Sequence, residues 1–253
     1  MYHINKSESA SMKTLKFPLA MSISCVLAAC GGSGSSGSGS SAATNYNFVI
    51  PAVNTQLTYD ETLVDNSDNT INLSYTQTVV AKNANGTFVV FQNDPANNSV
   101  TVDGTNYSVV PETITLTSSG QILSTVNQNT QITCTNVPFG EGPVYPISVG
   151  KNWSTNFAVT CGSGPSISYY HFGNVVDLET VTVPAGTFSA LKLASGIDFT
   201  DANGTTHSVT TTTWRDAATG IIVQQQAIYG YGGTPQTSGY VVSSGLELAS
   251  GTP

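Results

Sequence analysis

The feature that most constrains the fold is an alternation of apolar and polar residues that recurs along most of the chain. Successive side chains of a β-strand point to opposite faces, so this period of two predicts strands with one buried face. After Asn45 no stretch of a dozen residues shows the spacing of an amphipathic helix. The alternation is clearest at Ile71, Leu73, Tyr75, Gln77 and Val79, and it returns at Val100–Val102 and Ile114–Leu116.

Turn-forming residues separate these segments. Asn85-Gly86 and Asp103-Gly104 predict two-residue hairpin turns, in which both central positions need a positive φ. Longer hairpin loops are predicted at Ser119-Gly120, Asp201 to Gly204 and Asp216 to Gly220. The chain is therefore predicted to be all-β: an antiparallel meander of about fifteen strands, curved as a half-barrel or sandwich-like, with little helix outside the N-terminal leader.

The charge balance excludes one class of partner. Only 9% of the 253 residues are charged, with seven basic against fifteen acidic, for a net charge of −8. A protein that binds phosphates needs a stripe of Lys and Arg, so no nucleic acid is expected as a partner. The remaining polar residues are mostly Thr, Ser and Asn, and the Thr-rich composition suits strands better than helices.

The N-terminal segment has the features of a secretory signal. Residues 17–29 are apolar, Lys13 and Lys16 precede them, and small residues end the stretch. Thirteen helical residues span about 20 Å, too short for a bilayer core of about 30 Å. We therefore predict a signal peptide over residues 1–29, with Met12 as an alternative start.

The end of this signal is Leu27-Ala28-Ala29-Cys30, which resembles the lipobox of bacterial lipoproteins. The resemblance implies that the Cys30 thiol receives a diacylglycerol, that the residues before it are removed, and that the new amine is often acylated, for example with palmitate. The membrane is then a partner through the lipid. Gly31, where Asp would indicate inner-membrane retention in enterobacterial lipoproteins, points to the outer membrane. The alternative is an ordinary signal peptide with an incidental Cys30.

The composition divides the rest of the chain into three parts. Residues 30–45 are predicted to be a flexible Gly/Ser tether behind the lipidated cysteine. A segment rich in Pro and Gly at 138–146 separates an N-terminal β half, 46–140, from a C-terminal β half, 141–253. The halves could be a duplication or one continuous domain.

The second half resembles uncharacterised β-rich bacterial lipoproteins over about residues 144–230. The resemblance rests on three segments: Tyr145-Pro146-Ile147 with Gly150 and Trp153, VTVPAGTFSALKL at 181–193, and Trp214 with Gly220-Ile221-Ile222-Val223. These proteins look like relatives of the lipoprotein-localisation half-barrels, which implies a curved antiparallel sheet around an apolar concavity. Within the hairpin, Pro184 suits the second turn position and Gly186 supplies a positive φ.

Four cysteines are present, and two remain after Cys25 is removed with the signal and Cys30 takes the lipid. Cys134 and Cys161 fall on predicted strands of a protein exported to an oxidising compartment, so a disulfide between them is predicted. Two free buried thiols are the alternative.

Catalytic and metal-binding motifs are missing from the sequence. GxSxG, HExxH, GxxxxGK[ST] and a GxGxxG before a helix do not occur. His171 and His207 are isolated, and neither Cys134 nor Cys161 has a CxxC partner, so we expect no metal, no cofactor and no enzymatic activity. The acidic residues at Asp60-Glu61 and Asp65–Asp68 lack EF-hand spacing and are interpreted as solvated loops.

These observations favour a non-enzymatic, lipid-anchored envelope protein that binds an apolar small molecule or an envelope partner; the sequence does not specify the ligand-binding residues. Dense aromatic residues such as Tyr169 and Tyr170, which must face opposite sides of a strand, leave room for a ligand groove. A structural or surface-display lipoprotein without a small ligand is the alternative. A hydrolase that uses His171 or His207 is a remote one.

Overall fold

A computed structural model of the chain describes residues 44–201, 204–231 and 241–251. Within these ranges the protein has fourteen strands and no helix, which confirms the all-β prediction of about fifteen strands. Accordingly, no helix in the described ranges could cross a membrane. The predicted signal peptide, Cys30 and the tether up to residue 43 lie outside the described residues.

The fourteen strands follow one another along the chain. They are β1 (Gln56–Asp65), β2 (Thr70–Lys82), β3 (Phe88–Asn93), β4 (Ser99–Val102), β5 (Thr105–Ser108), β6 (Glu112–Leu116), β7 (Ile122–Asn127), β8 (Thr133–Val137), β9 (Asn152–Cys161), β10 (Ile167–Val183), β11 (Gly186–Thr200), β12 (Thr206–Asp216), β13 (Ile222–Tyr231) and β14 (Val241–Ser250). All pairings between them are antiparallel, as expected for a meander.

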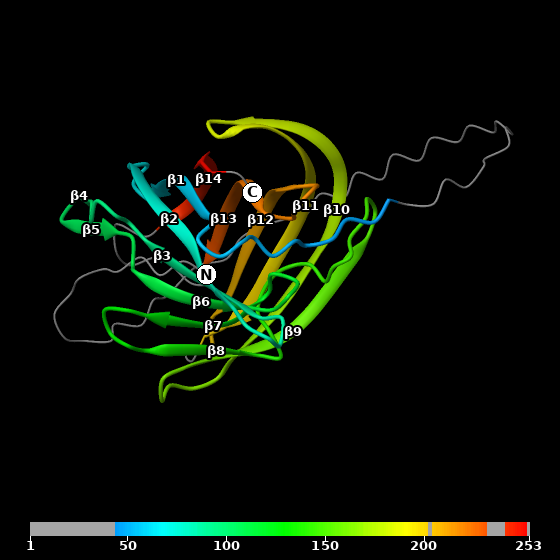
Figure 1. The fold of residues 1–253 in the computed structure, drawn as a ribbon. Coiled ribbons are helices and arrows are strands. Elements are labelled where there is room, and N and C mark those ends of the chain that lie inside the picture. The colour runs from blue at the N-terminus through cyan, green and yellow to red at the C-terminus, as the bar shows by residue number, and fades with distance from the viewer. Residues whose placement is uncertain (1–43, 202–203, 232–240, 252–253) are drawn as a thin grey trace, which may run out of the picture.

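Twelve of the strands form a closed barrel (Figure 1). Each pairs with its neighbours in the chain, except that β3 pairs with β6 because β4 and β5 form a separate two-stranded hairpin. The barrel closes where β1 pairs with β14, with Glu61 opposite Leu246. The curved sheet that the sequence predicts therefore exists, but it continues until its two edges meet instead of stopping as a half-barrel.

The two halves expected from the sequence contribute to this one sheet. Strands β1 to β8 belong to residues 46–140 and β9 to β14 to residues 141–253, so the halves meet along the β8–β9 and β1–β14 pairings. At the first of these seams Cys134 and Cys161 occupy directly paired positions, and their sulfur atoms are bonded at 2.08 Å. The predicted disulfide is thus present and connects the two halves.

Two predicted hairpin turns have different outcomes. Asp103 and Gly104 have φ values of 48° and 75° and form the expected two-residue turn between β4 and β5. At Asn85-Gly86 the two-residue prediction is wrong, because only Gly86 has a positive φ, of 84°. The N–H of Gly86 donates to the carbonyl of Asn83 at 3.0 Å. The loop is therefore three residues long and ends in a left-handed glycine, a common alternative hairpin geometry.

The VPAGTF segment forms the turn between β10 and β11. Pro184 and Ala185 connect the paired residues Val183 and Gly186, and Gly186 has a φ of 143°. Figure 1 shows this long hairpin curving over the top of the barrel. Val183 is buried there in the largest apolar cluster, which includes inward-facing residues of β1 and β2. The turn thus serves to fold the hairpin tip onto the core.

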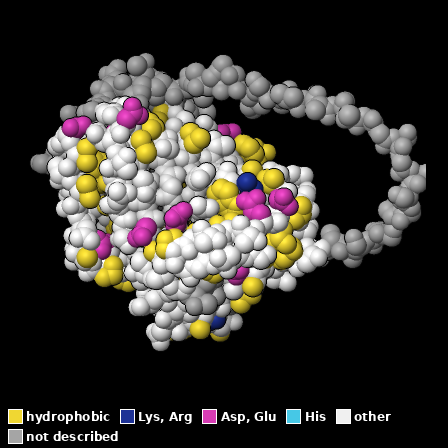
Figure 2. Space-filling view, turned by 90° about the horizontal axis from the view of Figure 1, so that it is seen from above, with side chains coloured by type: hydrophobic (Ala, Val, Ile, Leu, Met, Phe, Trp, Pro, Cys, Tyr) yellow, Lys and Arg dark blue, Asp and Glu magenta, His cyan; other side chains and the backbone are white. Residues whose placement is uncertain are grey.

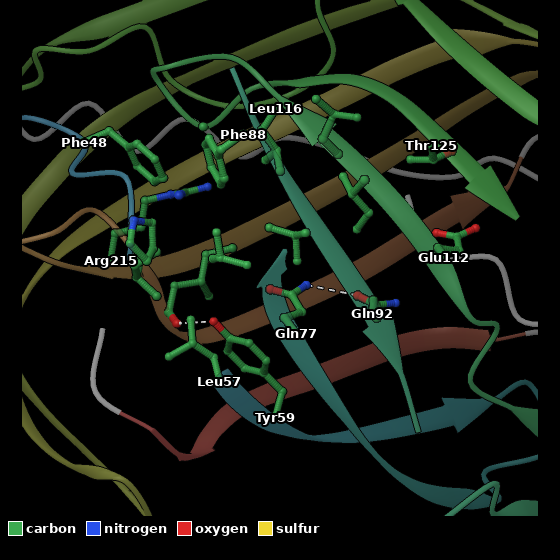
Figure 3. Close-up of a pocket in the computed structure, with 18 of the residues that line it drawn as sticks. Phe48, Leu57, Tyr59, Gln77, Phe88, Gln92, Glu112, Leu116, Thr125 and Arg215 are labelled. Atoms are coloured by element: carbon green, nitrogen blue, oxygen red, sulfur yellow. Dashed lines mark hydrogen bonds between the residues drawn. The ribbon is translucent and has the colours of Figure 1, made fainter. Parts of the chain in front are cut away.

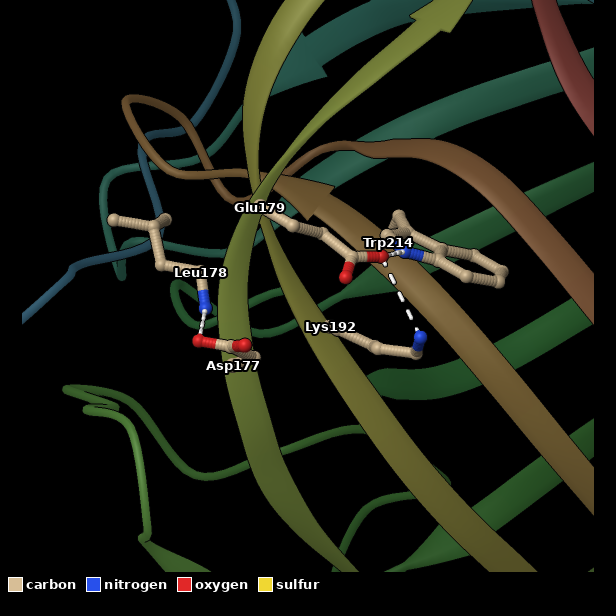
Figure 4. A network of polar contacts seen from close by, with 5 residues as sticks. All are labelled: Asp177, Leu178, Glu179, Lys192 and Trp214. Carbon is tan, nitrogen blue, oxygen red and sulfur yellow. Dashed lines mark hydrogen bonds and ion pairs between the residues drawn. The ribbon is translucent and has the colours of Figure 1, made fainter.

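The outer surface carries few charges. Figure 2 shows one face on which acidic side chains outnumber basic ones, in line with the composition. One polar network lies outside the barrel wall across β10, β11 and β12 (Figure 4). There the indole N–H of Trp214 donates to Glu179, and the Lys192 ammonium lies 3.5 Å from Glu179 and 5.2 Å from the Trp214 ring centroid. This network covers Trp214, which is only 8% exposed.

Candidate functional site

A cavity of about 170 Å³ lies inside the barrel (Figure 3). Side chains from β1, β2, β3, β6, β7 and β12 to β14 form its wall together with residues from four segments outside the strands. Most of the wall is apolar: Phe48, Pro51, Leu57, Val79, Phe88, Val90, Ile114, Leu116, Ile122, Ile221, Ile222 and Leu246. The strand alternation explains this wall, because the inward-facing position of each strand is the apolar one.

One side of the cavity is polar because the alternation is interrupted at equivalent positions of neighbouring strands. Gln77 occupies the inward position that precedes Val79 on β2, and its amide donates to the Gln92 side-chain oxygen at 3.0 Å. Gln92 in turn lies opposite Glu112 in the β3–β6 register. The three side chains form a polar row across β2, β3 and β6, all lining the cavity.

Glu112 is the most unusual member of this row. It is 4% exposed, and none of the described residues bonds to its buried Oε1 atom. Burial raises the pKa of the Glu112 carboxyl, because the charged form loses its hydration. Glu112 belongs to no sequence motif described above. The signal that could have found it is an acidic residue in phase with Ile114 and Leu116 on one face of a predicted strand.

The opposite side of the cavity contains Arg215. Figure 3 shows Arg215 and Glu112 on opposite sides of the view, with Phe88 and Leu116 between them. The Nη1 group of Arg215 donates to the Gly220 carbonyl at 2.9 Å. The guanidinium also interacts electrostatically with Glu141, another residue of the wall. The positive charge of Arg215 thus lies within electrostatic range of the Glu141 carboxylate.

Two segments outside the barrel strands cover the cavity. In the first, at residues 46–50, the Phe48 ring stacks on Phe88 with centroids 5.8 Å apart. The second follows β8 and contributes Glu141 to the wall. The two segments are joined by a β-bridge in which the Tyr46 and Ile147 backbones exchange hydrogen bonds of 2.7 and 2.9 Å. The cover is therefore held by backbone bonds as well as by ring contacts.

His171, considered a remote catalytic candidate, holds this cover in place. It is 4% exposed, and its Nδ1 accepts a hydrogen bond from the Gly142 N–H at 3.4 Å. Burial lowers the pKa of His171, which favours the neutral ring that such acceptance requires. His171 is not part of the cavity wall.

His207 lies at another place in the barrel. Its ring stacks on Phe199 with centroids 4.7 Å apart, and its Nε2 lies 3.3 Å from an oxygen of Asp201. Asp201 belongs to the turn between β11 and β12. The structure therefore brings neither candidate histidine to the cavity. Among the described residues, no three His, Cys, Asp or Glu side chains are grouped so that they could hold a metal ion.

The interpretation of the acidic residues on β1 as solvated loops is wrong for two of them. Glu61 faces the barrel interior and is 6% exposed, because it continues the inward series of Leu57 and Tyr59. Asp65 is 1% exposed, and its Oδ1 accepts from the backbone N–H groups of Ser67 and Asn69 at 2.8 and 2.9 Å. Asp65 thus organises the β1–β2 turn, whereas Glu61 is an interior carboxyl.

No protein-family model matches the chain, and no curated protein matches it. Among solved structures, it is similar to a protein described as exported, with a YmcC-like fold, from Bacteroides fragilis (14% identity, 83% of this chain and 100% of the other, TM-score 0.48). It is also similar to the hypothetical lipoprotein YmcC of Escherichia coli (14% identity, 77% and 85%, TM-score 0.43). A protein described as a lipoprotein from Parabacteroides distasonis is a third (12% identity, 82% and 99%, TM-score 0.46). At these identities and TM-scores the likenesses do not indicate a function.

Proposed function

We propose that this protein is a lipid-anchored envelope protein that binds a small, mainly apolar molecule inside its barrel. The observation that carries the proposal is the cavity of about 170 Å³ with a largely apolar wall. An apolar cavity of about 150 Å³ engineered into another protein binds benzene, so this volume suits a ligand with one ring or a short alkyl group.

The number of strands supports a hollow interior. Side chains just fill a barrel of about eight strands, whereas wider barrels leave space. Here twelve strands close the sheet. The proposed role is binding and not catalysis, because His171 holds a loop and His207 packs on Phe199, both away from the cavity wall.

The anchor part of the proposal rests on Leu27-Ala28-Ala29-Cys30 and on Gly31. Acylation of Cys30 would attach the protein to the membrane, and Gly31 favours the outer membrane as its location. We also propose a relation to the lipoprotein-localisation half-barrels, on the ground that both place an apolar concavity inside a curved antiparallel sheet.

The cavity is tested with a bulky substitution. In wild type we expect benzyl alcohol to bind, as measured by NMR titration. Ile114→Trp should abolish the binding, because the indole would occupy the cavity that Ile114 lines. Thr115→Trp is the matched control: Thr115 is the next residue of β6, so its side chain faces the other side of the sheet, and binding should persist.

Overpacking can cost about 1 to 3 kcal/mol of stability. Thermal unfolding of each variant therefore accompanies the titration, and Val90→Phe, a smaller increase at another wall position, replaces Ile114→Trp if that variant does not fold. Wild type that binds neither benzyl alcohol nor benzylamine, or binding that both cavity variants leave unchanged, would contradict the cavity proposal and favour a structural lipoprotein.

The anchor is tested by labelling cells with palmitate. Wild type should incorporate the label and remain with the membranes, whereas Cys30→Ser removes the thiol that receives the diacylglycerol and should lose both. Equal labelling of wild type and Cys30→Ser would exclude acylation at this residue. The barrel should be unaffected, because the first described contact of the chain is at Tyr46, and circular dichroism of both proteins checks this.

A further inference from the structure

We infer that the ligand of the barrel cavity carries a cationic amine next to its apolar group, and that Glu112 binds this amine. The inference rests on the proposed binding function and specifies the class of ligand. It combines three observations: the position of Glu112 in the wall, the unbonded state of its Oε1 atom, and the distribution of charge around the cavity.

Glu112 is directed to the cavity by its place in the sheet. Its register partner on β3 is Gln92, and both side chains line the cavity at the polar end of an otherwise apolar wall. The Gln92 oxygen already accepts the Gln77 amide at 3.0 Å. The carboxyl oxygen of Glu112 is consequently the free acceptor that a bound molecule would meet on this side.

An unbonded carboxylate oxygen in such a place calls for a partner. Buried charged groups in proteins are nearly always paired or bonded, because removing an unpaired charge from water is strongly unfavourable. Only 4% of the Glu112 surface is exposed. No described residue forms a hydrogen bond with its buried Oε1 atom. A ligand group that donates hydrogen bonds would supply the missing partner.

The charges of the wall decide which donor fits best. The charged residues that line the cavity are Glu112, Glu141 and Arg215. On the side of the cavity opposite Glu112, Arg215 donates a hydrogen bond to the Gly220 carbonyl and interacts electrostatically with Glu141. The wall therefore has one carboxyl group more than it has cations, and a ligand ammonium would balance the charge that Glu112 carries when it is ionised.

The test compares three probes of nearly the same shape: benzylamine, benzyl alcohol and benzoate, each titrated by NMR near neutral pH. We expect wild type to prefer benzylamine over benzyl alcohol by about 10-fold or more, the usual gain from a hydrogen bond to a charged group. Benzoate should bind most weakly, because its charge repels Glu112.

Glu112→Gln keeps the shape of the side chain and removes its charge. The variant should lose the preference for benzylamine while it binds benzyl alcohol within about 3-fold of wild type. Glu247→Gln is the control, because it also removes one carboxylate charge but lies outside the cavity wall, where Glu247 accepts the Gln224 amide at 2.9 Å. Its preference should equal that of wild type.

The results separate this inference from the proposed function. If benzyl alcohol binds as well as benzylamine, or if Glu112→Gln keeps the preference, the amine assignment is overturned and the binding cavity stands. If none of the three probes binds wild type, both are overturned. If benzylamine binds equally to Ile114→Trp, the amine site lies outside the cavity and the assignment to Glu112 is overturned.

Discussion

Replacing both Cys134 and Cys161 by serine should lower the free energy of unfolding by about 3.5 kcal/mol. The two residues are 27 positions apart, and a cross-link of that span removes about this much conformational freedom from the unfolded chain. In the folded protein their strands, β8 and β9, are already paired. The cross-link therefore acts mainly on the unfolded state, and the variant should keep the fold and melt at a lower temperature.

Urea denaturation of wild type and the double variant measures the difference. The matched control is the Thr135→Ser, Thr160→Ser pair, which lies at the next position of the same β8–β9 register and changes no cross-link. Its free energy of unfolding should stay within about 1 kcal/mol of wild type. A double cysteine variant as stable as this control would contradict the expected effect of the cross-link on the unfolded chain.

A second large effect is expected from Glu61, the carboxyl inside the barrel. Burial raises its pKa to about 7, whereas an unfolded Glu has a pKa of about 4.3. The folded protein therefore binds more protons than the unfolded chain between these two values, so stability falls as the pH rises from about 4 to about 7 and is constant above. The difference of pKa corresponds to about 4 kcal/mol lost over this window.

Glu61→Gln removes the titration and keeps the size of the side chain. At about pH 8 the variant should be more stable than wild type by up to about 4 kcal/mol, and the difference should shrink toward about pH 4. Urea denaturation across this range checks both slopes. Glu247→Gln, on the same barrel but bonded to Gln224, is the control and should keep the slope of wild type. A Glu61→Gln variant that follows the wild-type profile would contradict a buried, protonated Glu61.

The strands were predictable from the sequence and the closure was not. Strand formation depends on a local pattern, such as the inward series from Ile71 to Val79, and a local pattern is visible in the residues themselves. Closure depends on β1 meeting β14, which are separated by most of the chain. Twist, tilt and strand number determine that meeting, and no short motif encodes them.

The candidate site was harder to predict for two reasons. Its wall comes from eight strands, so its members become neighbours only through the register of the whole sheet. The buried carboxyls of the barrel interior are also hard to predict, because a charged residue ordinarily indicates solvent. Glu61, which neighbours wall residues in the sequence but does not line the cavity, and Glu112, which lines it, are both buried against that expectation. Their alternation with apolar neighbours was the better guide, since it places both carboxyls on the inward face.

The pairing of the first strand with the last also sets the conditions under which the barrel can form. Until β14 pairs with β1, the backbone N–H and C=O groups along one edge of β1 have no partner strand. Exposed strand edges of this kind promote aggregation. Contacts between distant parts of a chain form slowly, in milliseconds to seconds for β-rich folds. The chain would therefore spend its folding time as an open sheet, and its two unpaired edges would disappear only when the ring closes.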